Sequence, residues 1–286
     1  MAFVLPTNME NRPVAVIGAG TLGRRIALMF ADQGGLVRIY DPSAQAGEAA
    51  RKYVEENVAQ VAARIKGGKP GRVVFTDDMA ETLTDVWLVV EAVPERLELK
   101  KDIFGELDRA APPDAILASN SSSYASSEFI DRVEHPERVL NMHFYMPPAQ
   151  NAIDLMSDGR TDPGVIELLK RELPGYGLFP FEAHRESTGF IFNRIWAAIK
   201  REALGEVAEG VSTPRDIDEM WKINVGTPAG PFQMMDQVGL DVVLDIENHY
   251  AAENPNLPTG PRELLKEYVD AGHLGVKTGR GFYTHT

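Results

Sequence analysis

The stretch VAVIGAGTLGRRIALMFADQGGLVRIYD, residues 14–41, decides which fold the sequence predicts. It opens with the four apolar residues from Val14 to Ile17, which are too few for a helix and rich in β-branched side chains, so they predict a buried parallel strand. Gly18, Gly20 and Gly23 follow in the spacing G-x-G-x-x-G. This spacing predicts a tight turn from the strand into a helix whose start a ligand can approach closely.

The same stretch predicts a site for a dinucleotide. Free N–H groups at the start of a helix bind pyrophosphate, which makes Gly18, Gly20, Thr21, Leu22 and Gly23 candidate cofactor-binding residues. A second strand, residues 36–40, ends at Asp41, and an acid at this place accepts hydrogen bonds from ribose hydroxyls. Because its carboxylate would repel a 2′-phosphate, we expect NAD rather than NADP as the cofactor.

Composition limits the other possibilities. The chain has 286 residues, 44% of them hydrophobic, and a formal net charge of −13, which argues against a nucleic-acid partner. It has no cysteine, so disulfides, cysteine-based zinc sites and thiol catalysis are excluded, and we expect no metal site. No targeting signal or membrane-spanning run is visible, and we expect a cytoplasmic protein without a membrane partner.

Strands and helices alternate through the first two thirds of the chain, which is typical of a doubly wound parallel sheet. After residue 41 we expect strands at residues 73–75, 86–90, 115–118, 139–144, 153–156 and 178–182, and helices at 46–66, 95–110 and 163–171. The sequence therefore predicts an α/β, Rossmann-type NAD-binding domain over residues 1–184.

The last third of the sequence is helical. From Thr188 onward apolar residues recur at helical spacing, and Thr213 followed by Pro214 is a typical start of a further helix. We expect residues 185–286 to form a smaller all-helical domain that binds substrate or mediates dimerisation.

Seven motifs, read in order, carry a resemblance to a known family: VIGAGTLG, VVEAVPERLELKK, ASNSSS, HFYMPP, STGFIFNR, GTPAGPFQMMDQVGLD and KTGRGFY. Together they span nearly the whole chain, and in this order the chain resembles the 3-hydroxyacyl-CoA dehydrogenase family. The resemblance implies an NAD-dependent oxidoreductase that interconverts a 3-hydroxy and a 3-oxo compound and forms a homodimer through its helical domain. It also implies three catalytic residues, which are His143, Ser122 and Asn193. On the cofactor side it implies Glu95, Lys100 and Asn120.

The chemistry of alcohol oxidation explains why a histidine is suited to position 143. Oxidation of a secondary alcohol removes the hydroxyl proton as a hydride leaves the same carbon, and imidazole ordinarily titrates close to neutral pH. The resulting imidazolium needs a carboxylate at its other nitrogen, and we expect Asp154 on the next strand to provide it. Ser122 and Asn193 would supply neutral hydrogen-bond donors to the substrate oxygen.

Two departures from the family pattern leave the substrate open. The family normally pairs the histidine with Glu, which is one methylene longer than Asp154, and Met146-Pro147 replaces its usual Asn-Pro. A close alternative is therefore a relative that acts on non-CoA hydroxy acids or other small carbonyl compounds. The basic residues available for CoA phosphates, which are Arg51, Lys52, Arg64, Lys66 and Lys69, form no distinctive pattern.

Other interpretations follow from single residues. The Ser122 side chain could simply hydrogen-bond to the backbone of its own turn, and Asp154, at a strand end, could cap a turn. Glu95 and Lys100 could be a first-turn acid and a surface lysine of one helix. The related β-hydroxyacid dehydrogenases carry a lysine where Gly189 stands here, four residues before Asn193. A non-catalytic NAD-binding structural protein is the alternative of another class. The remaining histidines show no signal of a partner in the sequence and are expected at the surface; they are His135, His184, His249, His273 and His285.

Overall fold

A computed structural model describes residues 3–285. These residues form two compact units, one ending at Phe190 and the other beginning at Ile191. The domain boundary expected after residue 184 stays a prediction. No helix among the described residues is both long and apolar enough to cross a membrane.

The first unit contains one sheet, with strands β1 (Val14–Ile17), β2 (Leu36–Tyr40), β3 (Arg72–Thr76), β4 (Leu88–Glu91), β5 (Ile116–Ser119), β6 (Val139–Met146), β7 (Gln150–Met156) and β8 (Phe179–Ala183). Its order is β3-β2-β1-β4-β5-β6-β7-β8. The predicted doubly wound sheet is confirmed, and the turn that leaves β1 lies where the strand order reverses, the place where such sheets bind ligands.

One edge of the sheet departs from the parallel arrangement. β7 runs antiparallel to β6, and β8 then runs parallel to β7. Only residues 147–149 connect β6 to β7, and a connection this short can join antiparallel neighbours but is too short for a parallel crossover. This hairpin places His143 directly opposite Asp154.

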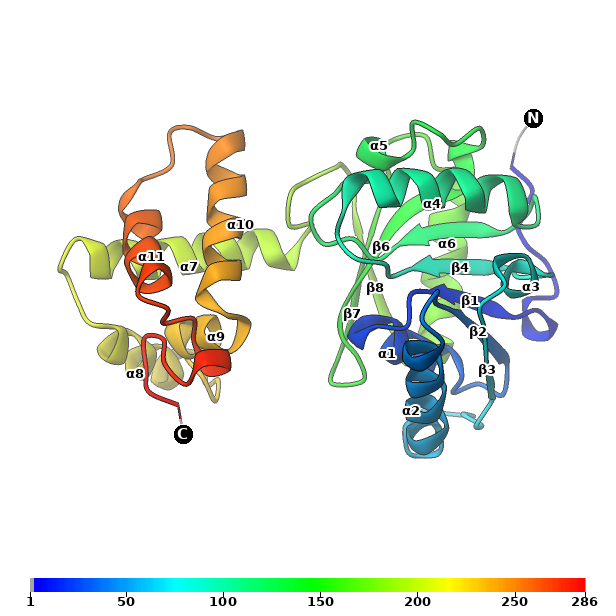
Figure 1. Cartoon of the computed structure of the whole chain (residues 1–286), viewed down its shortest axis with the longest axis horizontal. Coiled ribbons are helices and arrows are strands. Elements are labelled where there is room, and N and C mark those ends of the chain that lie inside the picture. Colours follow the sequence, from blue (N-terminus) through cyan, green and yellow to red (C-terminus); the bar gives the residue numbers. More distant parts are fainter. Residues whose placement is uncertain (1–2, 286) are drawn as a thin grey trace. The chain divides into compact units, whose positions relative to one another are not determined.

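Helices cover both faces of the sheet because side chains alternate along each strand. Val14 and Val16 face one core with α1 (Thr21–Phe30), α2 (Ala44–Ala62) and α6 (Pro163–Glu172). Ala15 and Ile17 face the other core, with α3 (Met79–Leu83), α4 (Leu97–Ala110) and α5 (Ser126–Phe129). Figure 1 shows α4 on the opposite side of the strands from α1 and α2. The short helices α3 and α5 were not among the expected elements.

The second unit is helical, as predicted, with helices α7 (Phe192–Ala208), α8 (Pro214–Val225), α9 (Pro231–Val238), α10 (Leu240–Glu253) and α11 (Gly260–Asp270). Thr213 caps α8 as expected, since its side chain accepts a hydrogen bond from the Asp216 N–H. The core contains Leu204, Phe232 and Leu265.

The buried carboxylate of Asp236 bonds to residues near the end of the second unit. Asp236 is fully buried and accepts hydrogen bonds from the N–H groups of Phe282 and Tyr283, both at 2.9 Å. Its Oδ2 also lies 2.8 Å from Nε2 of His285. No signal in the sequence indicated this partner of His285. Nor did any signal indicate the carboxylates of Glu137, Glu182 and Glu253, which lie within 4 Å of His135, His184 and His249. A side chain at Gly281 would clash with Asp236 Oδ1, at 2.1 Å from an added Cβ, which explains the glycine in KTGRGFY.

Asp32, just after α1, gives a prediction for stability. It is fully buried, and burial raises its pKa to about 7 against a smaller lowering effect of the neighbouring Gln33 side chain. The folded state therefore holds this proton more tightly than the unfolded chain, so stability falls as the pH rises from about 4 to about 7 and stays reduced above that. At about 1.4 kcal/mol for each pKa unit, ionised Asp32 costs the fold up to about 4 kcal/mol at pH 8. The asparagine amide is also costly to bury without partners, so we expect Asp32→Asn to raise the free energy of unfolding at pH 8 by about 2 kcal/mol.

Urea unfolding of the full chain at pH 5 and pH 8 measures this difference. The gain should shrink at pH 5, where wild-type Asp32 is protonated in the folded state. The exposed Asp77, exchanged for asparagine, is the matched control and should have little effect at either pH. An Asp32→Asn gain of equal size at both pH values would contradict the explanation by titration.

Candidate active site

The glycine turn between β1 and α1 has the geometry that a bound dinucleotide needs. Gly18 has φ +109°, and a Cβ there would lie 2.6 Å from the Ala92 carbonyl oxygen. A Cβ at Gly23 would lie 1.8 Å from the Gly18 carbonyl oxygen, so the helix packs on the turn only because this residue is glycine. A Cβ at Gly20 would meet nothing within 4 Å, which leaves the backbone there open to a ligand.

The start of α1 and the end of β2 complete this cradle. Gly20 is the N-cap of α1 and provides no side-chain acceptor, so the first-turn N–H groups of Thr21, Leu22 and Gly23 are available to phosphate oxygens. Asp41 Oδ2 accepts a hydrogen bond from the Ala19 N–H at 2.8 Å. The ribose-side carboxylate is thus joined to the turn, and these residues fit NAD.

His143 and Asp154 form a buried pair on β6 and β7. The imidazole Nδ1 lies 3.3 Å from Asp154 Oδ2, and the two residues are 5% and 3% exposed. Tyr145 donates a hydrogen bond from its hydroxyl to the same oxygen, at 2.6 Å. The carboxylate can fix the imidazole tautomer, which leaves Nε2 as the atom that can exchange a proton with a substrate.

Aromatic rings fix the orientation of the imidazole. Phe190 stacks on it with centroids 5.0 Å apart and an angle of 2° between the planes, and Tyr145 meets it edge-on at 4.7 Å. Phe190 has φ +53°, a backbone conformation that costs a non-glycine residue on the order of 1 kcal/mol or more. The ring of His143 is therefore confined to one plane.

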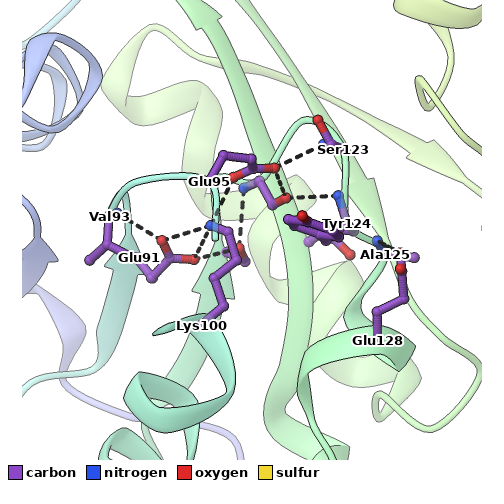
Figure 2. Close-up of polar contacts among 11 residues, drawn as sticks. Glu91, Val93, Glu95, Lys100, Ser123, Tyr124, Ala125 and Glu128 are labelled. Carbon is purple, nitrogen blue, oxygen red and sulfur yellow. Dashed lines mark hydrogen bonds and ion pairs between the residues drawn. The ribbon is translucent and has the colours of Figure 1, made fainter. Parts of the chain in front are cut away.

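Lys100 is the centre of a buried ionic cluster (Figure 2). The residue is only 1% exposed, and its Nζ lies 3.0 Å from each carboxylate oxygen of the fully buried Glu91 and 3.0 Å from Glu95 Oε2. The alternative that Lys100 is a surface lysine was wrong. Glu91 ends β4 and Lys100 lies on α4, so the ion pair ties the helix to the carboxyl end of the strand.

The serine turn after β5 is built onto this cluster. Ser119 donates to Glu91 Oε2 at 2.6 Å, and Ser121 donates to Glu95 Oε1. Glu95 also accepts the Ser123 N–H at 3.1 Å (Figure 2). Through these bonds the two carboxylates fix the backbone on both sides of Ser122, which is exposed.

Asn120 and Asn193 have different surroundings. The Asn120 side-chain oxygen accepts the Phe144 N–H at 2.9 Å, so Asn120 joins the serine turn to β6 next to His143. Asn193 lies in the first turn of α7, in the second unit, and its contact with substrate stays a prediction. Within residues 3–285, no group of three His, Asp or Glu side chains is placed to hold a metal ion.

Sequence reasoning missed Glu91 and Tyr145. A signal existed for each, since Glu91 is the carboxylate that closes the apolar run of β4, and Tyr145 follows His143 by two residues on one strand, where side chains share a face. Phe190 gave no signal, because its contact with His143 depends on the path of the chain after β8.

Comparison with known proteins agrees with this geometry. The family model described as 3-hydroxyacyl-CoA dehydrogenase, NAD binding domain, matches residues 13–180, and the model of the family's C-terminal domain matches residues 189–285. The chain is 34% identical over 287 residues to a probable 3-hydroxybutyryl-CoA dehydrogenase of Bacillus subtilis, with 97% of this chain and 98% of the relative covered.

Two further proteins are similar over almost the whole chain. One is 5-formyl-3-hydroxy-2-methylpyridine 4-carboxylate 5-dehydrogenase of Mesorhizobium japonicum, 30% identical, with 96% of this chain and 91% of the relative covered. The other is the solved structure of FadB2 from M. tuberculosis, with a TM-score of 0.85, 31% identity, and 97% and 99% of the two chains covered. The chain belongs to the 3-hydroxyacyl-CoA dehydrogenase family and is an NAD-dependent oxidoreductase that acts on a CH–OH group.

Proposed function

We propose that this protein interconverts a 3-hydroxyacyl thioester and its 3-oxo form, with His143 as the general base. The observation that supports this most is the buried contact between His143 Nδ1 and Asp154 Oδ2 at 3.3 Å. A histidine held by a carboxylate at Nδ1 presents Nε2 to the hydroxyl group of a substrate.

Each of the proposed catalytic residues has a separate role in this reaction. His143 takes the hydroxyl proton during oxidation and returns it during reduction, and Asp154 stabilises the imidazolium that forms. Ser122 and Asn193 donate hydrogen bonds to the substrate oxygen without forming an ion pair with it. NAD, when bound, accepts the hydride from the carbinol carbon.

The cofactor side of the proposal involves the glycine turn, Asp41 and the cluster around Lys100. Asp41 would accept hydrogen bonds from the ribose, and its charge disfavours a 2′-phosphate. Glu95, Lys100 and Asn120 would shape the nicotinamide side. The structure gives Lys100 a partner on each side, so it would act by fixing Glu95 and the serine turn as well as by its charge.

Two arginines support a substrate with an anionic group. The guanidinium groups of Arg24 and Arg25 lie 4.8 Å and 5.9 Å from the ring centroid of Tyr53, and among the described residues neither lies within 4 Å of a carboxylate. Arg25 also donates to the Pro147 carbonyl oxygen at 2.9 Å, in the loop after β6. By contrast, Arg51 and Lys52 pair with glutamates on α2 itself. Arg24 and Arg25 provide local positive charge in a chain whose net charge is −13.

A second candidate function is the oxidation of a free hydroxy acid without CoA. The shorter Asp154 and the Met146-Pro147 sequence favour it, and so does the similarity to the Mesorhizobium relative, which is named a dehydrogenase of a pyridine carboxylate. Arg24 and Arg25 suit a carboxylate as well as a CoA phosphate.

A substrate panel separates the two candidates. NADH oxidation is followed with acetoacetyl-CoA and with free acetoacetate at equal concentrations. We expect kcat/KM to be higher with the thioester by about tenfold or more, because CoA supplies binding energy remote from the reacting carbon. Activity on the free acid alone would replace the thioester proposal with the second candidate, and NADPH in place of NADH should support little turnover.

We also propose a homodimer that forms through the helical unit. Apolar side chains on α8 support it, since Met220 and Ile223 are three residues apart on one helix face and are 65% and 80% exposed, which is unusual for large apolar residues. Sedimentation equilibrium should give the mass of two chains, and Ile223→Lys should give that of one. A cytoplasmic location, supported by the absence of cysteine, remains part of this proposal.

A further inference from the structure

Two side chains contact one oxygen of Asp154. Tyr145 donates to Oδ2 at 2.6 Å, and His143 Nδ1 lies 3.3 Å from the same atom. The three residues are on adjacent antiparallel strands, and a register irregularity between Phe144 and Met146 falls at Tyr145. Tyr145 follows His143 by two residues, so both side chains lie on the face of the strand that carries Asp154 opposite His143.

The two contacts differ in strength. A hydroxyl bonded to a carboxylate is strongest at about 2.5–2.7 Å, and a cationic N–H bonded to a carboxylate at about 2.7–2.9 Å. The Tyr145 bond, at 2.6 Å, lies within the range for a hydroxyl donor. The His143 contact, at 3.3 Å, is longer than the range for a cationic N–H donor. The phenol therefore takes the larger share of the negative charge on Oδ2.

The short side chain of Asp154 accounts for the long contact with His143. An aspartate has one methylene fewer than a glutamate, so from the same strand position it reaches less far toward the imidazole. The carboxylate is 3% exposed, so water does little to share its charge, and the phenol of Tyr145 is the donor 2.6 Å away.

Other charged groups on the surrounding elements have partners of their own or are exposed. On α4, α5, the serine turn, β8 and the segment after β8 these groups are Glu91, Glu95, Lys100, Glu128, Glu182, His184, Arg185 and Glu186. Among the described residues of the first unit, Tyr145 is the titratable group that donates a hydrogen bond to the pair of His143 and Asp154.

We propose that Tyr145 acts through Asp154, because its hydroxyl shares the charge of Oδ2 and so weakens the carboxylate's pull on the imidazole proton of His143. The proposal rests on the function proposed for His143. Because the phenol shares the charge of Asp154, the imidazole releases its proton more readily than it would beside an unshared carboxylate. Tyr145 thereby sets the pH range in which His143 can act as a base during alcohol oxidation.

Titration of the histidine rings by NMR tests this proposal without any turnover. The chain has six histidines, and loss of one signal in His143→Gln identifies the ring of interest. In Tyr145→Phe we expect the midpoint of the His143 titration to rise by about half a pH unit or more, because the whole charge of Oδ2 then acts on the imidazole. The acid limb of the kcat/KM profile for oxidation should move by the same amount.

Tyr176→Phe is the matched control, since it removes a phenol from the first unit that packs against Phe30 and not against Asp154, and the His143 midpoint should stay unchanged. Site-specific 3-fluorotyrosine at position 145 is a second variant. Its more acidic hydroxyl should bond more strongly to Asp154 and lower the midpoint. A midpoint that stays constant or falls in Tyr145→Phe would overturn the proposal. If no 3-hydroxy or 3-oxo substrate reacts with wild type, the proposed function fails, and the NMR midpoints still decide the role of Tyr145.

Discussion

Exchange of His143 for glutamine is expected to lower kcat by about 10²–10⁴, the range over which a positioned general base contributes to catalysis. Glutamine retains hydrogen-bonding groups close to the positions of the imidazole nitrogens, but it cannot take up a proton. Because the ring is only 5% exposed and stacks on Phe190, bulk water is poorly placed to act in its stead. The loss should therefore appear in both directions of the reaction.

The affinity for NADH separates this chemical effect from damage to the fold. The glycine turn and Asp41 lie on β1, α1 and β2, whereas His143 lies on β6, so the dissociation constant of NADH in His143→Gln should stay within about twofold of wild type. His135→Gln is the matched control, because its side chain is 59% exposed and pairs only with Glu137. Turnover that survives in His143→Gln at more than about a tenth of the wild-type rate would exclude His143 as the base.

The second large effect is expected at Glu91, on stability. Glu91→Gln should lower the free energy of unfolding by about 3 kcal/mol, because removing one partner of a buried ion pair leaves the other charge uncompensated. Glu91 is fully buried, and Lys100 would retain only the partly exposed Glu95. The serine turn should loosen as well, since Ser119 Oγ would lose its charged acceptor.

Urea unfolding of the full chain measures this loss, with Glu98→Gln on α4, the helix that carries Lys100, as the control. The Glu98 side chain is 71% exposed and forms only surface ion pairs, so its exchange should cost less than about 1 kcal/mol. The double variant Glu91→Gln, Lys100→Met should recover part of the lost stability, because it also removes the uncompensated positive charge of Lys100. A Glu91→Gln chain as stable as wild type would contradict the claim that the ion pair of Glu91 and Lys100 stabilises the fold.

Much of the fold follows from local sequence patterns. The glycine spacing and the apolar runs predict the strands and helices of the parallel sheet, because a buried parallel strand reads as a short β-branched run ended by turn residues. The helices α3 and α5 have only 5 and 4 residues, too few for a helical period to show. Thr213 and Pro214 predict the start of α8, since an N-cap and a first-turn proline act within a few residues.

The active site could be predicted less completely. His143 and Asp154 lie on successive predicted strands with a short connection, so the sequence brings them near each other, and the structure places them 3.3 Å apart. The burial of Lys100 could not be predicted, because it depends on how α4 packs over the ends of β4 and β5, which are far apart in the sequence. The stacking of Phe190 likewise requires a left-handed backbone that no residue preference indicates.

Transfer of deuterium tests the central claim most directly. A 3-hydroxyacyl-CoA with deuterium on its carbinol carbon is incubated with NAD and the wild-type protein, and the products are examined by NMR and mass spectrometry. We predict deuterium at C4 of the nicotinamide in the NADH that forms, one atom for each 3-oxoacyl product, with the hydroxyl proton released to the medium. If no NADH forms from this compound or from the matching free acid, or if the deuterium appears in water, the account of this protein as a 3-hydroxy dehydrogenase is wrong.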